Sequence, residues 1–147
     1  MKNILVAIDE IETTSITSPL MERTMELARA FSGKVWLIHI VPHSSDTAPF
    51  NIDKQALRHE AAAELRNEHE FLQTLARCAR DRGVEAKALL IEGATVSTIL
   101  KESVRLDIDL IVLGCRRHRL PYGILAEFTE EGLLGSCSCP IMYVPIQ

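Results

Sequence analysis

The sequence predicts a single α/β domain, a three-layer sandwich in which helices cover both faces of a parallel sheet. Five short apolar segments without helical period alternate along the chain with segments whose apolar residues recur at helical spacing. Strands that alternate with helices form right-handed crossovers, so the strands run parallel and helices pack on both sides. At 147 residues the chain is long enough for one core, and no linker or repeat divides residues 1–147.

The five predicted strands are apolar runs that stop at turn or charged residues, as strands buried on both faces do. The third run carries Glu85 and Lys87 among its apolar residues, which is typical of an edge strand. The last run, from Ile141 to Val144, follows Cys139 and Pro140 and closes the chain. The predicted strands are residues 4–8, 35–41, 84–91, 108–113 and 141–144.

Four helices are predicted between these strands from apolar stripes and terminal residues. The first begins at Pro19 and ends at Gly33, and the second covers residues 53–82 and ends at Gly83. The third begins with Thr95 as its N-cap, and the fourth begins near residues 126–129 and ends before Pro140. Residues 43–52 are predicted to form an exposed loop. The expected buried stripes are Leu20, Thr24, Leu27, Ala28 and Phe31; Leu57, Ala61, Leu65, Leu72, Leu75 and Ala79; and Val96, Ile99, Leu100 and Val104.

Charge and hydropathy exclude two classes of partner. The formal net charge is −4, so no bulk positive field attracts the chain to nucleic acid or anionic lipid. A membrane span needs about 20 consecutive apolar residues, and the sequence contains no such run. The four cysteines lack the paired spacing of zinc sites and the density of a secreted disulfide scaffold. We therefore expect reduced thiols in a cytoplasmic protein without a metal.

No motif in the sequence supplies a positioned nucleophile and base, so we expect a protein that is not an enzyme. Cys137 and Cys139 are too few ligands for a closed metal site and are expected to be buried, inert thiols. Cys115 stands beside three arginines, which favours a lowered thiol pKa. The histidines are scattered and are expected on the solvated surface, and Trp36 is expected in the core. The histidines are His39, His43, His59, His69 and His118.

Three segments resemble the universal stress protein family, and together they span nearly the whole chain. The opening strand ends in Asp9, the second strand ends in His39-Ile40-Val41-Pro42, and a glycine-helix-strand-glycine core runs from Gly93 to Gly114. The resemblance implies a Rossmann-like sheet, of the adenine-nucleotide α-hydrolase type, with strand order 3-2-1-4-5. It also implies a homodimer that pairs the last strands, residues 141–144, edge to edge; a monomer with a covered edge is the alternative.

The loop after the fourth strand departs from the family pattern of Gly-x-x-Gly, nine residues, and Gly-Ser or Gly-Thr. Gly114 and Cys139 are 139 − 114 = 25 positions apart, which is the separation expected in the family, so Gly114 fills the first place. The second glycine position falls on Arg117, the third on Glu127 and the hydroxyl position on Phe128. Glycines let backbone N–H groups approach phosphates, so three of four positions have lost their chemistry.

Arg116, Arg117, His118 and Arg119 follow the fourth strand, at the edge where open α/β sheets bind ligands. Arginine side chains bind phosphate well, but charge runs are usually solvated surface, and we interpret this run as a solvated loop. Asp9 stands where the resemblance implies a ribose contact, and an aspartate after a strand is also a common turn former. The candidate ligand residues are Asp9, Val41, Gly114, Arg116, Arg117 and Arg119.

The resemblance and the altered loop together predict a stress-associated, non-catalytic homodimer that acts through an unknown protein partner. Weak or no ATP binding is expected, and hence no cofactor. The alternative is a nucleotide sensor of the same family that holds ATP or AMP through side-chain contacts.

Overall fold

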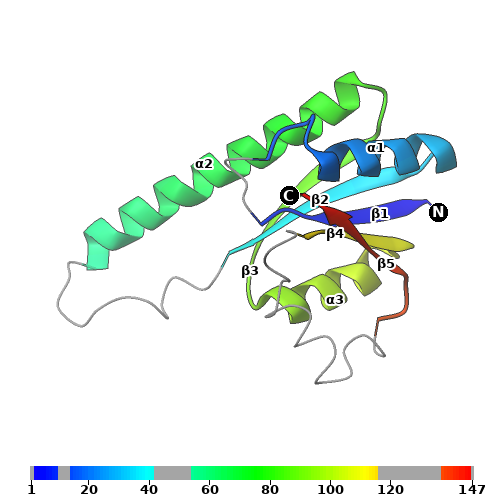
Figure 1. The fold of residues 1–147 in the computed structure, drawn as a ribbon. Helices are drawn as coiled ribbons and strands as arrows, with labels where there is room; N and C mark the ends of the chain where they lie inside the picture. Colours follow the sequence, from blue (N-terminus) through cyan, green and yellow to red (C-terminus); the bar gives the residue numbers. More distant parts are fainter. Residues whose placement is uncertain (1, 10–13, 42–53, 116–136, 147) are drawn as a thin grey trace.

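The computed structural model describes residues 2–9, 14–41, 54–115 and 137–146. Within them, five parallel strands form one sheet in the order β3-β2-β1-β4-β5 (Figure 1). The predicted fold class and strand order are therefore confirmed. The strands are β1 (Asn3–Ala7), β2 (Lys34–Val41), β3 (Ala86–Glu92), β4 (Leu110–Cys115) and β5 (Ile141–Pro145).

Three helices are described: α1 (Pro19–Phe31), α2 (Lys54–Asp81) and α3 (Thr95–Arg105). α1 and α2 cover one face of the sheet and α3 covers the other, as Figure 1 shows. This arrangement follows from right-handed crossovers, because connections that step in opposite directions along the sheet lie on opposite faces. The fourth predicted helix and the predicted loop at residues 43–52 lie outside the described residues.

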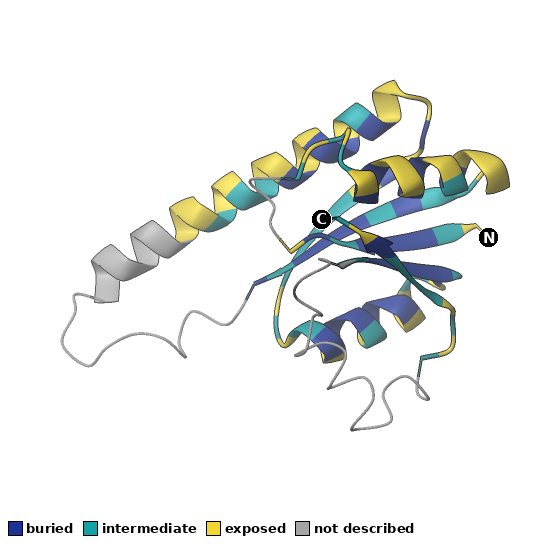
Figure 2. Cartoon of the chain, in the orientation of Figure 1, coloured by how far each residue is buried: buried dark blue, intermediate teal, exposed yellow. Residues whose placement is uncertain are grey.

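Two hydrophobic clusters hold the layers together, one on each face of the sheet (Figure 2). Successive strand residues point to opposite faces, so Ile4 and Val6 join the α1/α2 cluster while Leu5 joins the α3 cluster. All three side chains are completely buried. Because both faces of the sheet are covered, its strands must be apolar at nearly every position. The strands lie close to their predicted positions.

Helix α1 begins where predicted but ends one residue earlier. Ser18 is its N-cap and accepts a hydrogen bond from the Met21 N–H, with Pro19 in the first turn. The left-handed C-cap conformation belongs to Ser32 (φ 52°), and the next residue, Gly33, donates its N–H to the Ala28 carbonyl at 2.8 Å.

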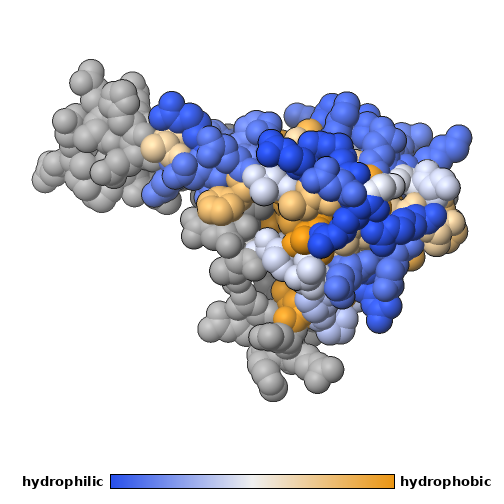
Figure 3. All heavy atoms as spheres, turned by 90° about the horizontal axis from the view of Figure 1, so that it is seen from above, coloured by the Kyte–Doolittle hydropathy of each residue, from blue (hydrophilic) through white to orange (hydrophobic). Residues whose placement is uncertain are grey.

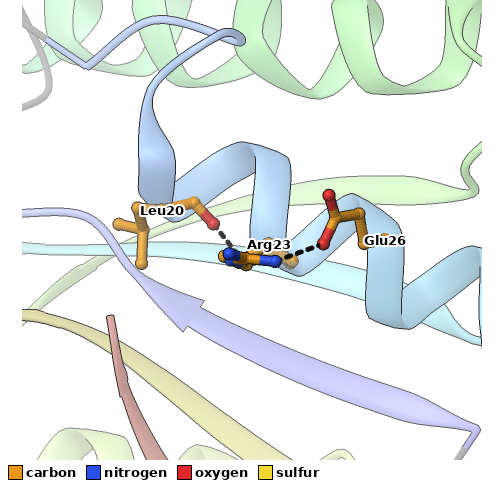
Figure 4. Close-up of polar contacts among 4 residues, drawn as sticks. Leu20, Arg23 and Glu26 are labelled. Carbon is orange, nitrogen blue, oxygen red and sulfur yellow. Dashed lines mark hydrogen bonds and ion pairs between the residues drawn. The ribbon is translucent and has the colours of Figure 1, made fainter. Parts of the chain in front are cut away.

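The outer surface of α1 is polar. Arg23 donates to Glu26 at 2.9 Å along this surface, one turn from Leu20 (Figure 4). An exposed ion pair of this kind contributes about 0.3–0.5 kcal/mol. Phe31 is 49% exposed, so its expected place in the buried stripe is wrong. It is the last residue of the helix, where the chain is already turning away from the sheet.

Helix α2 extends well beyond the sheet (Figure 1), and the residues of α2 that are described as buried lie in its second half. Leu72, Leu75 and Ala79 are buried as predicted, and Gly83 (φ 82°) follows the helix end. The molecular face seen in Figure 3 is mostly hydrophilic, with apolar residues in small separate areas. Among the described residues, no helix has the length and apolar character needed to cross a membrane.

Helix α3 packs on the sheet through Val96 and Ile99, as predicted. Val104 is 74% exposed, so its predicted burial is wrong. Near the end of the helix the buried residues are Glu102 and Ser103 instead. The N-cap is Ala94 rather than Thr95, which is the first helical residue, and no side chain caps this end.

Candidate functional site

The carboxyl ends of β1 and β4 form the edge where the sequence places the candidate ligand residues. The chain leaves β1 toward β2 on one side, and β4 pairs with β1 on the other, so the strand order reverses here. Ligands of open α/β sheets bind outside the carboxyl ends of strands at such a switch point. The register pairs Ala7 with both Ile38 and Leu113, so β2 ends three residues and β4 two residues beyond the level of Ala7, close to the position of Asp9. Asp9, Val41 and Gly114 therefore come to the same edge.

Asp9 lies two residues beyond the end of β1 and is solvent-exposed. The preceding residue, Ile8, is still tied to the sheet, because its N–H donates to the Ile38 carbonyl at 2.8 Å. The backbone is thus fixed immediately before Asp9, which places this residue at the switch point. A carboxylate in this position is suited to accept hydrogen bonds from hydroxyl or amine groups of a ligand.

His39 is buried beside this edge, so its predicted place on the solvated surface is wrong. Its Nδ1 lies 2.6 Å from the Ile8 carbonyl oxygen, and because a carbonyl only accepts, Nδ1 carries the proton and donates. Its Nε2 faces Glu68 of α2, with 3.6 Å between Nε2 and Oε2. His39 therefore joins β1 to α2 one residue before Asp9. Its position inside an apolar strand run was the sequence signal for burial.

Val41 is buried at the end of β2 and is held by the turn that follows β3. Its carbonyl accepts the Gly93 N–H at 2.9 Å. Gly93 has φ 158°, and a Cβ there would lie 2.6 Å from Thr98 Oγ1. Glycine is required because the first turn of α3 packs directly on this backbone. The β3–α3 turn is thereby brought next to Val41.

Gly114, in β4, is the residue that the sequence comparison with the family pattern assigns to the first position of the phosphate loop. A Cβ on Gly114 would lie 3.0 Å from Ile146 Cδ1, so the Ile146 side chain occupies the space beside this glycine. Ile146 in turn packs against the cluster on the α1/α2 face. Close packing against Ile146 thus favours a small residue at this position.

Arg116, Arg117 and Arg119 lie outside the described residues, as do Glu127 and Phe128. The same holds for the side chain of Cys115, so the hypothesis about its pKa stays a prediction. Of the six candidate ligand residues, the structure describes Asp9, Val41 and Gly114 and brings them to one edge. Among described residues, no group of three or more His, Cys, Asp or Glu side chains is placed to hold a metal ion.

The amino-terminal edge of the sheet carries a second polar network. The Asp109 carboxylate accepts the Asn3 N–H at 2.9 Å and the Lys2 N–H at 2.7 Å, and these two hydrogen bonds hold the pKa of Asp109 below its ordinary value. The Asn3 side chain accepts from Trp36 Nε1 at 3.2 Å and donates to the Asp107 carbonyl at 3.3 Å. This network joins β1, β2 and the start of β4.

Trp36 is half-buried rather than fully in the core. Lys34 Nζ lies 4.2 Å and Lys87 Nζ 5.8 Å from the ring centroid, so two cations flank its face. Such contacts contribute about 0.5–1 kcal/mol at exposed sites. The indole therefore helps to join β2 and β3 at this edge.

Cys137 and Cys139 are half-exposed, so the expectation that they are buried is wrong. Their sulfur atoms lie 3.8 Å apart, and the Cys137 thiol donates to the Cys139 carbonyl at 3.3 Å. Burial, together with the neighbouring Cys137 thiol, raises the pKa of Cys139 to about 12. The pair lies just before β5.

A five-stranded parallel sheet with helices on both faces and a switch point between β1 and β4 defines a doubly wound α/β protein. The universal stress protein family model matches residues 1–145. The chain belongs to this family.

Solved structures share the fold at low sequence identity. A universal stress protein from Burkholderia pseudomallei has TM-score 0.69 and 19% identity, covering 98% of this chain and 96% of that chain. The Archaeoglobus fulgidus protein in complex with dAMP has TM-score 0.61 and 16% identity, covering 98% of both chains. An Arabidopsis thaliana family member with AMP bound has TM-score 0.57 and 16% identity, covering 100% of this chain and 93% of that chain. No curated protein sequence matches the chain.

Proposed function

We propose that this universal stress protein is a non-enzymatic, cytoplasmic stress-response protein that acts as a homodimer through contacts with a protein partner and binds ATP weakly or not at all. The protein would thus have the fold of the family, and its function would not depend on a bound triphosphate.

The packing of Gly114 against Ile146 carries the proposal. An added Cβ would lie 3.0 Å from Ile146 Cδ1, so a larger residue at this position would have to displace the Ile146 side chain. Packing against Ile146 therefore favours a small residue at Gly114 whether or not a phosphate binds. The other three positions, Arg117, Glu127 and Phe128, have lost the small or hydroxyl side chains that the phosphate loop needs.

Charge supports the same conclusion. A carboxylate about 4 Å from a phosphate oxygen costs about 4 kcal/mol at an effective dielectric constant near 20. A non-glycine residue at positive φ costs about 1–2 kcal/mol. Glu127 in a glycine position would incur both costs, and the arginines after β4 would have to offset them.

Titration calorimetry with ATP and magnesium tests the proposal. We expect no heat of binding for the wild-type chain at micromolar ATP. The matched variant replaces Arg117→Gly, Glu127→Gly and Phe128→Ser together, which restores the family pattern, and we expect it to bind ATP more tightly than the wild type. Micromolar binding of ATP by the wild type would overturn the proposal.

A second candidate function is the sensing of an adenine nucleoside monophosphate at the same edge. The observation in its favour is that Asp9 and Val41 lie together there, and neither belongs to the phosphate loop. Two structures with this fold contain dAMP and AMP, which carry one phosphate. Calorimetry with AMP separates the candidates: binding that is lost in Asp9→Ala supports the sensor, and no binding supports the partner-contact function.

The dimer in the proposal rests on the open edge of β5, the last strand in the sheet order. Ile141, Met142 and Tyr143 are partly buried against the two core clusters, and the backbone edge of an apolar strand favours pairing with another chain. A second copy related by a two-fold axis covers this edge with an identical surface.

A further inference from the structure

We propose that Cys137 and Cys139 form a reversible dithiol–disulfide site that a low-molecular-weight disulfide oxidises. Their sulfur atoms lie 3.8 Å apart in the reduced protein, and both residues are half-exposed. They immediately precede the edge strand β5, so the site links thiol oxidation to the strand assigned to the dimer. The proposal does not depend on nucleotide binding.

The geometry favours closure of the ring. Only Ser138 separates the two cysteines, and the chain bends at Cys139, just before β5. A disulfide bond is about 2.05 Å long, so the sulfur atoms must approach by roughly 2 Å, within the reach of side-chain rotation. A ring across a single residue is strained, and strained disulfides are more easily reduced. The site therefore returns to the dithiol in a reducing cytoplasm.

The chemistry consists of two exchange steps. The Cys137 thiolate attacks one sulfur of the small disulfide, forms a mixed disulfide and releases one small thiolate. The Cys139 sulfur then attacks the Cys137 sulfur, closes the ring and releases the second small thiolate. The two protons of the protein thiols end on the two released thiols, so two protein thiols are oxidised and one small disulfide is reduced.

The surroundings assign different roles to the two thiols. Burial and the neighbouring Cys137 thiol raise the pKa of Cys139 to about 12, and the nearby Asp109 carboxylate acts in the same direction. Cys139 is therefore the less reactive thiol of the reduced protein and acts second. Once Cys137 has formed the mixed disulfide, its thiol no longer raises the pKa of Cys139, and Cys139 gives up its proton as it attacks. Cys137 is left as the attacking group, because the thiolate is the nucleophile in exchange.

Formation of the Cys137–Cys139 disulfide affects the hydrogen bond that joins the start of β5 to β4. Pro140 directly follows Cys139, and its carbonyl accepts the Ile111 N–H at 3.0 Å. A ring that restrains Cys139 also restrains the neighbouring peptide unit, so oxidation changes how firmly β5 is held on β4. The hydrogen bond between Ile111 and Pro140 thus makes the attachment of β5 depend on the oxidation state of the two cysteines.

Trypsin provides a test on the unmodified protein. No Lys or Arg follows Arg119, so both cysteines fall in the peptide 120–147, while Cys78 and Cys115 fall in other peptides. The protein is equilibrated with mixtures of reduced and oxidised glutathione, alkylated, digested and analysed by mass spectrometry. We expect peptide 120–147 to lose both alkylation sites in a single transition and to regain both after reduction.

The matched variant Cys137→Ser removes the partner thiol and is expected to leave Cys139 alkylated across the same mixtures. Hydrogen exchange of the Ile111 amide provides a structural readout and is expected to differ between the reduced and oxidised wild type. Independent loss of the two alkylation sites, a lasting glutathione adduct, or a crosslink between two copies of the peptide would overturn the proposal. An Ile111 amide that exchanges equally in both states would overturn the coupling to β5.

Discussion

Two glycines at turns are fixed by different constraints. Gly93 (φ 158°) leaves no room for a side chain, because an added Cβ would lie 2.6 Å from Thr98 Oγ1. Gly83 (φ 82°) is constrained by its backbone alone, since nothing lies within 4 Å of an added Cβ. In the sequence, Gly83 marks a helix end and Gly93 opens the glycine-helix-strand-glycine segment, and only the packed structure distinguishes crowding from backbone conformation.

Gly93→Ala is expected to destabilise the protein more than Gly83→Ala. The Gly83 substitution costs about 1–2 kcal/mol for a side chain in the left-handed region. The Gly93 substitution adds overpacking of about 1–3 kcal/mol. The free energy of unfolding in urea measures both, and Thr98→Ala in the Gly93→Ala background should recover part of the loss, whereas Thr98→Ser should not. Equal losses at the two glycines would contradict the crowding at Gly93.

His39 shows the limit of residue-by-residue prediction. A histidine is ordinarily placed at the surface, but this one is 8% exposed and donates to the Ile8 carbonyl at 2.6 Å. The partner is a backbone atom from a strand that is distant in sequence. Such a contact leaves no mark in the local pattern, so burial could be inferred from the strand and the hydrogen bond could not.

At the scale of elements, the apolar spacing located the helices more reliably than it defined their buried faces. Leu72, Leu75 and Ala79 of α2 are buried as predicted, whereas Phe31 of α1 and Val104 of α3 are not. The width of a buried stripe depends on how much sheet lies beneath the helix, and helix ends extend past it. Periodicity describes only the helix itself.

The junction of β1 with the start of β4 depends on a charged side chain. Because backbone N–H groups of Asn3 and Lys2 lower the pKa of Asp109, its ionised form stabilises the folded state. This contribution is complete above the unfolded-state pKa, about 4, and is lost as pH falls through the lower folded-state value.

Asp109→Asn should therefore reduce stability at neutral pH, and the difference from the wild type should shrink as the pH falls below about 4. Urea unfolding at a series of pH values measures this difference. Glu70→Gln, at an exposed position of α2, is the matched control and should show little difference at neutral pH. A wild-type advantage that persists unchanged in strong acid would rule out the carboxylate as its source.

At the scale of the whole molecule, the outer edge of β5 decides whether the sheet ends or continues into a partner. The Pro140 carbonyl faces β4, where it accepts the Ile111 N–H. Backbone groups of alternate strand residues face the same side, so those of Met142 face β4 and those of Ile141 face the open edge. The proposed dimer would pair this outward-facing row.

Hydrogen exchange at single amides tests the dimer. We expect the Ile141 amide to be protected at protein concentrations at which analytical ultracentrifugation shows a dimer, and to lose protection on dilution to the monomer. The Met142 amide is the internal control, because it faces β4 and should stay protected in both states. A sedimenting dimer in which the Ile141 amide exchanges freely would place the interface elsewhere, and a monomer at all concentrations would rule out the dimer.

The sequence by itself determined the class of fold and the succession of strands and helices in the described residues. These depend on local signals, namely apolar runs, helical period and glycine at turns, each of which is complete within a few residues. Resemblance to the family added the strand order, and the structure confirmed it.

Only the tertiary structure decided what those residues touch. It placed Ile146 against Gly114, joined His39 to Ile8, and set the Cys137 and Cys139 sulfur atoms 3.8 Å apart at the entry to β5. The first two contacts join segments far apart in the chain, and the third depends on the path of the backbone into the sheet. Local pattern fixes which elements form, whereas contacts of this kind exist only once the elements are packed together.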